Sequence, residues 1–236
     1  MEKPTSFAVI VPCYNESGNI EKCARGLIEQ EQFDEIILVD DGSTDGTSDL
    51  CELLMERYGP RLTTYHLPEN KGKNYALRIG AQRARADVVI IYDADLTVSP
   101  ADLSAIKPVF GQNLNNFVYG SRFIRKMEKG AMSRLNRWGN AFFAYWVSGL
   151  LNRRVTDVLC GVKAISRRNF LAIDPTHCRW GDFDLFFGAA RQKLGFHEIP
   201  VFYKKRRAGA SKMKVMKAGL GFFQECVRYS FRAKIN

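Results

Sequence analysis

Two aspartates separated by one residue are the most informative candidate functional residues in the sequence. Asp93 and Asp95 follow the apolar run 88–92 (VVIIY), which predicts a buried strand ending where they begin. Alternate residues of an extended chain point the same way, so a turn at this point would bring both carboxylates to one cation. Divalent ions such as Mg²⁺ or Mn²⁺ prefer oxygen ligands and often hold substrate phosphates in their remaining positions. The alternative interpretation is that the two aspartates only form a turn.

Polar residues also follow two other predicted strands. Residues 12–16 (PCYNE) come after the apolar run 7–11, and residues 40–43 (DDGS) come after the run 35–39. Helical patterns separate the runs, which predicts a mostly parallel sheet with helices on both faces and ligands at the carboxyl ends of its strands. Loop capping explains each loop alone. It explains less well why five carboxylates gather at one sheet edge.

The remaining pattern extends this α/β arrangement along the chain. Strands are expected at residues 7–11, 35–39, 63–67, 88–92, 116–120, 162–166 and 197–203. Helices are expected near residues 20–28, from a cap at Asp45 to residue 54, at 73–85, within 132–151, at 183–194 and at 216–231. No internal repeat or low-complexity linker divides the chain, so one domain with a C-terminal appendage is expected.

Composition places the chain among globular proteins with an anionic partner. The 236 residues are 46% hydrophobic and 25% charged, which excludes disordered and fibrous classes. Of the net charge of +10, residues 122–154 carry +7 and residues 204–236 carry +9, so the rest is mildly acidic. Two basic segments favour phosphate groups, nucleic acid or a membrane surface as partner, although basic surface also serves solubility.

Cysteine usage and apolar runs bear on the compartment. The six cysteines include no pair closer than Cys13 and Cys23, so zinc-type spacing is absent and reduced thiols in a cytosolic setting are expected. Residues 7–11 are too few for the apolar region of a signal peptide. Residues 138–152 lack charge but number only 15, short of the roughly 20 apolar residues that cross a bilayer.

Several motifs together resemble a known family. The stretches VIVPCYNESGNI, EIILVDDGSTDGT, ENKGKNYAL and ADVVIIYDADL are similar to the inverting family 2 glycosyltransferases of GT-A fold. The likeness continues through residues 120–122, 157–164 and 206–212, and the last two stretches narrow it to the branch of dolichyl-phosphate mannosyltransferase and bacterial polyprenyl-phosphate glycosyltransferases. It implies a Rossmann-like GT-A domain over 1–211, with a nucleotide-sugar half at about 1–121 and an acceptor half at about 122–211. A basic amphipathic C-terminal helix over 212–236 would follow.

The resemblance also implies which residues form the donor site. Those that would hold the nucleotide sugar are Pro12, Tyr14, Glu16, Asp40 or Asp41, Lys73, Asp93 and Asp95. Those that would hold the metal, Mg²⁺ or Mn²⁺, are Asp93, Asp95 and Thr97. Thr97 stands where the mannosyltransferase has a glutamine, so its hydroxyl would replace an amide oxygen.

On the acceptor side, the resemblance implies a polyprenyl phosphate bound by arginines beside an apolar surface. Besides Asp95, the residues expected in catalysis are Arg122, Arg134, Arg206 and Asp157. An ionised phosphate oxygen needs no strong base, so catalysis would be alignment and charge neutralisation, with Asp157 orienting arginines or sugar. The aromatic and basic stripes near Arg134 and at 216–231 suggest peripheral attachment at the cytoplasmic face of a membrane, directly or through a membrane-embedded partner, although such stripes also pack in cores.

Two rival functions remain. A glycosyltransferase that acts on a saccharide hydroxyl needs a carboxylate base, for which Asp182 and Asp184 are candidates besides Asp157. Phe186 replaces a glutamate found in many relatives, which disfavours this reading. A non-catalytic module that senses nucleotide sugar or grips nucleic acid leaves the paired aspartates unexplained, so no nucleic acid partner is expected.

Overall fold

The computed structural model describes residues 4–111, 113–173, 181–206 and 227. The C-terminal helix expected over 212–236 lies outside the described residues apart from Val227.

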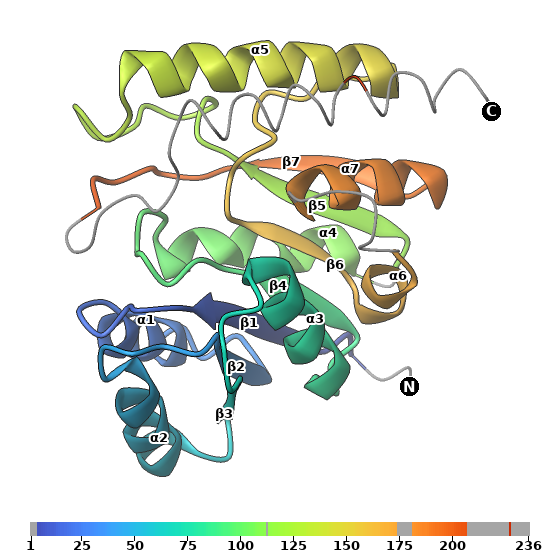
Figure 1. Cartoon of the computed structure of the whole chain (residues 1–236). Coiled ribbons are helices and arrows are strands. Elements are labelled where there is room, and N and C mark those ends of the chain that lie inside the picture. The colour runs from blue at the N-terminus through green and yellow to red at the C-terminus, as the bar shows by residue number, and fades with distance from the viewer. Residues whose placement is uncertain (1–3, 112, 174–180, 207–226, 228–236) are drawn as a thin grey trace.

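A seven-stranded sheet in the order β3-β2-β1-β4-β6-β5-β7 forms the centre of the described chain (Figure 1). Its strands are β1 (Phe7–Cys13), β2 (Glu35–Asp40), β3 (Leu62–His66), β4 (Val88–Ile91), β5 (Asn116–Ser121), β6 (Lys163–Ser166) and β7 (Gly195–Pro200). Strands β1 to β4 run parallel, and β5 and β7 pair in parallel as well. Only β6 opposes its two neighbours. The expected mostly parallel sheet is therefore confirmed.

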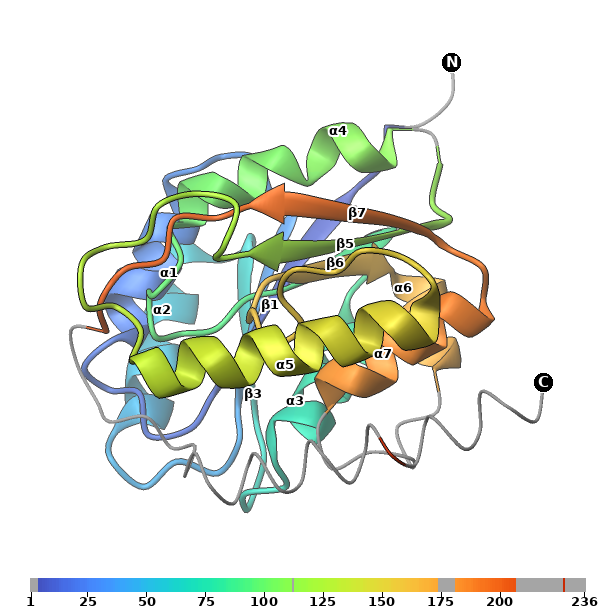
Figure 2. The same ribbon diagram turned by 90° about the horizontal axis from the view of Figure 1, so that it is seen from above.

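Helices cover both faces of the sheet. They are α1 (Ile20–Ile28), α2 (Thr47–Tyr58), α3 (Lys73–Arg83), a 3₁₀ turn at Pro100–Ala105, α4 (Lys107–Phe110), α5 (Arg134–Leu151), α6 (Arg167–Ala172) and α7 (Gly181–Arg191). One core contains side chains from α1, α2 and α4, and the other contains side chains from α3, α5, α6 and α7. Figure 2 shows α4 and α5 on opposite sides of the strands.

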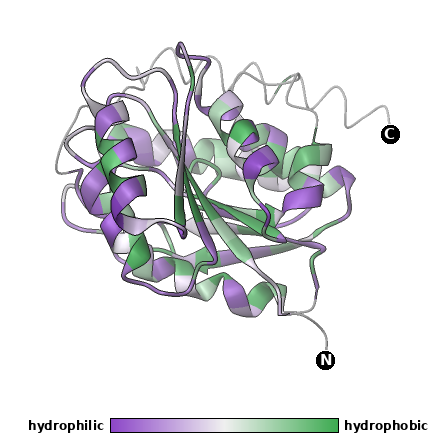
Figure 3. Cartoon of the chain, turned by 90° about the horizontal axis from the view of Figure 1, so that it is seen from below, coloured by the Kyte–Doolittle hydropathy of each residue, from purple (hydrophilic) through white to green (hydrophobic). Residues whose placement is uncertain are grey.

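Sandwiching between two helical layers explains the unbroken apolar strands. Along β1, Phe7 and Val9 enter one core while Ala8 and Ile10 enter the other, so the strand shows no polar alternation. The strands form the hydrophobic centre in Figure 3, where the helices carry both hydrophilic and hydrophobic residues. Gly80 lets α3 approach β1 closely, since a Cβ there would lie 2.5 Å from Ile10 Cγ2.

All seven expected strands form, with ends shifted by a few residues. The last strand ends at Pro200 rather than residue 203, and the chain beyond it makes a single bridge between Tyr203 and Val98. Helix α2 begins at Thr47 after Gly46, whose φ of +85° suits glycine. Asp45 still accepts the Thr47 N–H at 3.1 Å. Among the described helices, none is long and apolar enough to cross a membrane.

Candidate active site

The loops that carry the predicted carboxylates share one edge of the sheet. Strands β2, β1 and β4 are adjacent and parallel, so their carboxyl ends lie together. The loop after β1 contains Tyr14 and Glu16, the loop after β2 begins with Asp41, and the turn after β4 contains Asp93 and Asp95. The topology therefore confirms that these three loops lie at one edge of the sheet. In parallel sheets of this kind, ligands bind at that edge.

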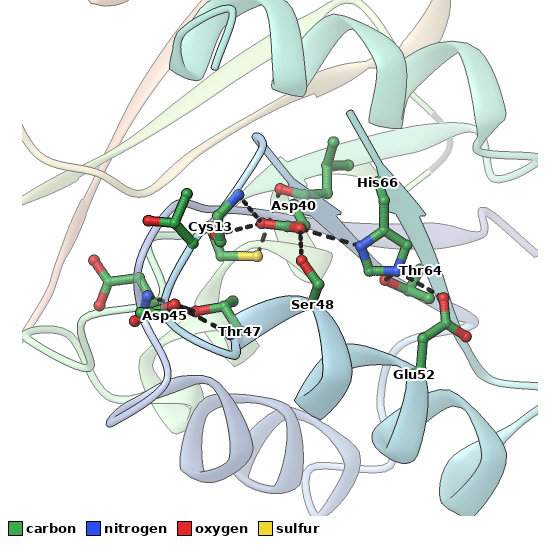
Figure 4. A network of polar contacts seen from close by, with 12 residues as sticks. Cys13, Asp40, Asp45, Thr47, Ser48, Glu52, Thr64 and His66 are labelled. Carbon is green, nitrogen blue, oxygen red and sulfur yellow. Dashed lines mark hydrogen bonds and ion pairs between the residues drawn. The ribbon is translucent and has the colours of Figure 1, made fainter. Parts of the chain in front are cut away.

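Asp40 ends β2 and is the centre of a buried polar network (Figure 4). One carboxylate oxygen accepts hydrogen bonds from the Ser43 N–H at 3.2 Å and from the Ser43 hydroxyl. The other oxygen accepts the Ser48 hydroxyl at 2.5 Å and lies 3.1 Å from Nδ1 of His66. Burial opposes ionisation of Asp40, but the bonds from Ser43, Ser48 and His66 outweigh it and hold its pKa below the ordinary value. Both oxygens of this expected nucleotide ligand are therefore bound within the protein.

Asp41 binds the loop that leads into α3. Its carboxylate accepts the backbone N–H groups of Lys71 at 2.7 Å and Gly72 at 2.9 Å. Burial raises the pKa of Asp41, and these two donors act against that rise. Asp41 thus fixes the start of α3, where Lys73 is the first residue.

Hydrogen bonds join the loops after β1 and β2. The Asn15 N–H donates to Ser43 Oγ at 2.9 Å, and the Thr44 N–H donates to Asn15 Oδ1 at 2.8 Å. The Glu16 N–H donates to Thr47 Oγ1 at 2.8 Å. Loop capping thus accounts for Asn15 and its partners. Tyr14 and Glu16, together with Pro12 at the end of β1, are half-buried at the same edge.

The two aspartates after β4 each bind a cationic side chain. Lys73 Nζ lies 2.5 Å from Asp93 Oδ1, and Arg206 Nη2 donates to Asp95 Oδ2. Burial opposes ionisation of Asp93, yet Lys73, followed by Lys163 and Arg206, holds its pKa below the ordinary value. The chain turns here, with Leu96 at a φ of +57°.

Thr97 contacts Asp95 directly. Its backbone N–H and its hydroxyl both donate to Asp95 Oδ1, at 3.0 and 2.8 Å. The residue expected as a third metal ligand therefore orients the second aspartate in this structure.

Lys163 is a site residue that the sequence analysis missed. It is 1% exposed, and its Nζ donates to the Cys160 carbonyl and to Asp182 Oδ1, both at 2.6 Å. A lysine within the apolar strand GVKAIS was the available signal, because a buried charge requires a partner. This pair attaches the start of α7 to the site and engages one oxygen of Asp182, a candidate base. Asp184, another candidate base, is buried in α7.

The donor set suits a divalent cation completed by substrate oxygens. No group of three or more histidine, cysteine or acidic side chains is arranged for a metal in the part of the chain that the structure describes. Asp93 and Asp95 instead offer two carboxylates that already attract positive groups, Lys73 and Arg206. Two carboxylates plus substrate phosphates are a usual arrangement for Mg²⁺. The residues therefore fit such an ion.

Asp157 holds Arg122 in a buried bidentate ion pair. Arg122 Nε donates to Asp157 Oδ2 at 2.6 Å and Nη2 donates to Oδ1 at 2.8 Å. Burial opposes the charge on Arg122, but Asp157 outweighs burial and raises the Arg122 pKa. The guanidinium carbon also lies 5.1 Å from the centre of the Tyr203 ring. Asp157 is thus placed to orient Arg122, and its role in catalysis stays a prediction.

The other two expected arginines lie at separate places. Arg206 contacts Asp95, whereas Arg134 is exposed at the start of α5. Helix α5 buries Phe143 and Val147 in the core that it shares with α3, α6 and α7. Its outer face exposes a helical stripe of large apolar side chains, namely Leu135, Trp138, Phe142 and Tyr145, at 64, 77, 49 and 82%. The helix therefore serves as core on one side and as an unusually apolar surface on the other.

Sequence comparison now assigns the family. Residues 8–185 match the family described as glycosyl transferase family 2. The chain belongs to glycosyltransferase family 2. The carboxylates after β1, β2 and β4 all fall within the matched range, so the part of this glycosyltransferase that matches the family includes the candidate donor site.

Several curated relatives of the glycosyltransferase are named for lipid-linked acceptors. It is 27% identical to an undecaprenyl-phosphate 4-deoxy-4-formamido-L-arabinose transferase of Sodalis glossinidius, over 91% of this chain and 65% of that protein. It is 28% identical to a dolichyl-phosphate beta-glucosyltransferase, ALG5D, of Trichomonas vaginalis, over 91% of this chain and 70% of that protein. Glycosyltransferase AglJ of Haloferax volcanii is 27% identical, over 100% of this chain and 75% of that protein. These names support the polyprenyl-phosphate branch.

Solved structures agree on the fold. Glucosyl-3-phosphoglycerate synthase from Mycobacterium tuberculosis superposes with a TM-score of 0.68 at 19% identity, covering 95% of this chain and 80% of that chain. A mannosyltransferase from Pyrobaculum calidifontis, solved with GDP-Man and Mn²⁺, gives 0.67 at 21% identity, covering 96% and 65%. The enzyme therefore has the GT-A fold, as expected from the sequence.

Proposed function

We propose that this glycosyltransferase transfers a sugar from a nucleoside-diphosphate sugar to a polyprenyl phosphate, with inversion at the anomeric carbon. The observation that carries the proposal is the contact of Arg206 with Asp95, 111 residues apart in sequence. It joins the basic segment expected to bind the acceptor to the acidic turn expected to bind the donor. The names of the lipid-phosphate relatives support the same acceptor class.

The donor half binds and orients the nucleotide sugar. Pro12, Tyr14, Glu16 and Asp41 lie along the loops where base and ribose would rest, and Lys73 lies beside Asp93 for the diphosphate. Asp93 and Asp95 would hold the Mg²⁺ or Mn²⁺ ion, which when bound supplies charge neutralisation to the departing diphosphate. Thr97 keeps Asp95 in place through its two hydrogen bonds.

The acceptor half aligns an already ionised nucleophile. A phosphate oxygen carries negative charge at neutral pH, so the chain need supply no strong general base. Arg122, held by Asp157, and the exposed Arg134 would position the phosphate for in-line attack, with Arg206 next to the donor. Asp182 is engaged by Lys163 at 2.6 Å, which makes it a weak candidate for a base and disfavours a saccharide hydroxyl as acceptor.

We assign the lipid-facing surface to the outer face of α5. Trp138 and Tyr145 are the most exposed members of its apolar stripe, and Arg134 and Arg137 lie on the same helix. Aromatic and basic residues on one helix face suit the interface of a membrane that contains anionic lipid. The enzyme would then act peripherally at the cytoplasmic face, directly or beside a membrane-embedded partner.

The test follows labelled sugar into lipid. Purified enzyme is given a panel of UDP and GDP sugars with polyprenyl phosphate and Mg²⁺ or Mn²⁺, and the organic extract is counted. We expect label in lipid with the wild type and with Asp49→Ala, an exposed carboxylate change on α2, and loss of label with Asp95→Ala.

Other outcomes overturn the proposal in different ways. Label appearing only in a saccharide product, and lost in Asp182→Asn, would establish the hydroxyl acceptor instead. Absence of turnover with every donor and acceptor would contradict a catalytic role and leave a nucleotide-sugar binding module.

A further inference from the structure

His66 ends β3 between two carboxylates from two different elements. Its Nδ1 lies 3.1 Å from Oδ2 of Asp40, at the end of β2, and its Nε2 lies 2.7 Å from Oε1 of Glu52, on α2 (Figure 4). The His66 side chain is 31% exposed, Asp40 is buried and the Glu52 side chain is 48% exposed. The Thr64 hydroxyl lies 3.4 Å from Nε2 and carries no charge. Asp40 and Glu52 are the titratable groups whose contacts with the ring the structure records.

The arrangement calls for a doubly protonated ring. An ionised carboxylate only accepts hydrogen bonds, and a neutral imidazole has a single N–H to donate. His66 therefore satisfies both Asp40 and Glu52 only when both ring nitrogens carry a proton. The hydrogen bond from His66 is also one of those that hold the Asp40 pKa low.

Asp40 connects His66 to the loops of the donor site. The Asp40 carboxylate holds Ser43, and Ser43 Oγ accepts the Asn15 N–H at 2.9 Å in the loop that carries Tyr14 and Glu16. The Asp40 carbonyl accepts the Leu67 N–H at 2.8 Å at the start of the loop leading to α3. His66 is thus linked through Asp40 and Ser43 to the loop that carries Tyr14 and Glu16, which are expected to contact the nucleotide.

We propose that His66 is a positioning residue for the donor nucleotide: in its protonated form it fixes Asp40, and through Ser43 it fixes the loop after β1. The inference rests on the proposed donor site at this sheet edge. Without a donor from residue 66, Asp40 loses one of its hydrogen bonds, and the loop loses part of its support. Donor binding should therefore weaken in a variant whose side chain cannot donate to Asp40.

The experiment measures binding of UDP and GDP alone by calorimetry at neutral pH. His66→Ala should weaken binding by about tenfold, the scale of one lost hydrogen bond to a charged group. His66→Asn, whose amide can still donate to Asp40, should recover much of that loss. In turnover assays the change should appear in donor KM rather than in kcat.

His197→Asn is the matched control. This histidine, on β7, has its Nε2 3.2 Å from Asn116 Oδ1, away from the network around Asp40, so the variant should bind both nucleotides as the wild type does. Glu52→Gln should weaken binding less than His66→Ala does, because the ring can still donate from Nδ1 to Asp40.

Three results would be decisive against the proposal or its basis. Equal losses of nucleotide affinity in His66→Asn and His66→Ala would overturn it, and so would unchanged nucleotide affinity in a His66→Ala variant whose thermal unfolding shows it folded. If wild type binds neither nucleotide at any pH, the donor site itself fails, which is a separate outcome.

Discussion

Lys73, Lys163 and Arg206 balance the charge of Asp93, Asp95 and Asp182 at the donor edge. A divalent cation held by Asp93 and Asp95 would compete with the protein cations that these carboxylates already contact. Lys163 is 1% exposed and fixed, and Lys73 is part of α3, whereas Arg206 lies in a segment outside the helices and strands. Arg206 is therefore the group expected to leave Asp95 when metal and donor bind, and to turn toward the acceptor phosphate.

Removing this arginine should strengthen metal binding while weakening turnover. We expect Arg206→Ala to bind Mn²⁺ several-fold more tightly without nucleotide, because Asp95 loses a competing cation. Lipid glycosylation should fall, because the acceptor phosphate loses a guanidinium. Electron paramagnetic resonance of free Mn²⁺ measures the affinity. Arg125→Ala, which breaks the ion pair with Asp102, is the control, and equal or weaker Mn²⁺ binding by Arg206→Ala would contradict the competition.

Gly161 sets the position of Asp93 from the other side. A Cβ on Gly161 would lie 2.1 Å from Asp93 Oδ2, so Gly161→Ala must push that carboxylate aside. Displacing a catalytic group by about 1 Å can reduce rate on the order of a hundredfold, so we expect a large loss of turnover in a folded protein. Gly149→Ala is the control, because nothing lies within 4 Å of its added carbon. Comparable turnover in the two variants would show that Asp93 need not hold its place.

At the scale of elements, α5 shows why a helical stripe alone does not reveal its use. Phe143 and Val147 face the core, while Trp138 and Tyr145 remain on the surface. The core interpretation of the sequence therefore applies to one face of the helix, and the proposed membrane contact belongs to the opposite, exposed face.

The outer face of α5 should govern binding to lipid vesicles. We expect Trp138→Ser combined with Tyr145→Ser to reduce binding to vesicles containing anionic lipid by about tenfold or more, since burying a large apolar side chain contributes about 1.5–3 kcal/mol. Sedimentation with vesicles measures this. Leu53→Ser, at a 59% exposed position on α2, should bind as the wild type does. An equal loss in both variants would argue against a specific face.

The helices and strands could be predicted because each one depends mainly on a short stretch of neighbouring residues. Apolar runs bounded by polar turns located all seven strands, and the spacing of Asp93 and Asp95 located the acidic turn. Long-range partners were not predictable. Lys163 meets Asp182 from another element, and His66 meets Asp40 from a neighbouring strand, so neither pair has a local signature.

At the scale of the whole molecule, the buried network at Asp40 makes stability depend on acid. The folded state lowers the Asp40 pKa, so Asp40 stabilises the fold above its unfolded pKa and loses that contribution as the pH falls through the folded value. We expect the free energy of unfolding to drop more steeply below about pH 5 in wild type than in Asp40→Asn. Urea unfolding at several pH values tests this. Parallel pH profiles would mean that other carboxylates set the acid response.

The reversed strand β6 also has a consequence for the order in which the chain folds. Strands β1 to β4 complete their mutual pairing within the first 91 residues, but β5 has no place beside them until residues 163–166 insert between β4 and β5. During synthesis on the ribosome, the free side of β4 therefore stays open while about seventy further residues emerge. An open strand edge invites pairing with other chains. Until β6 is made, the nascent enzyme therefore presents the edge of β4 to other chains in addition to that of β3.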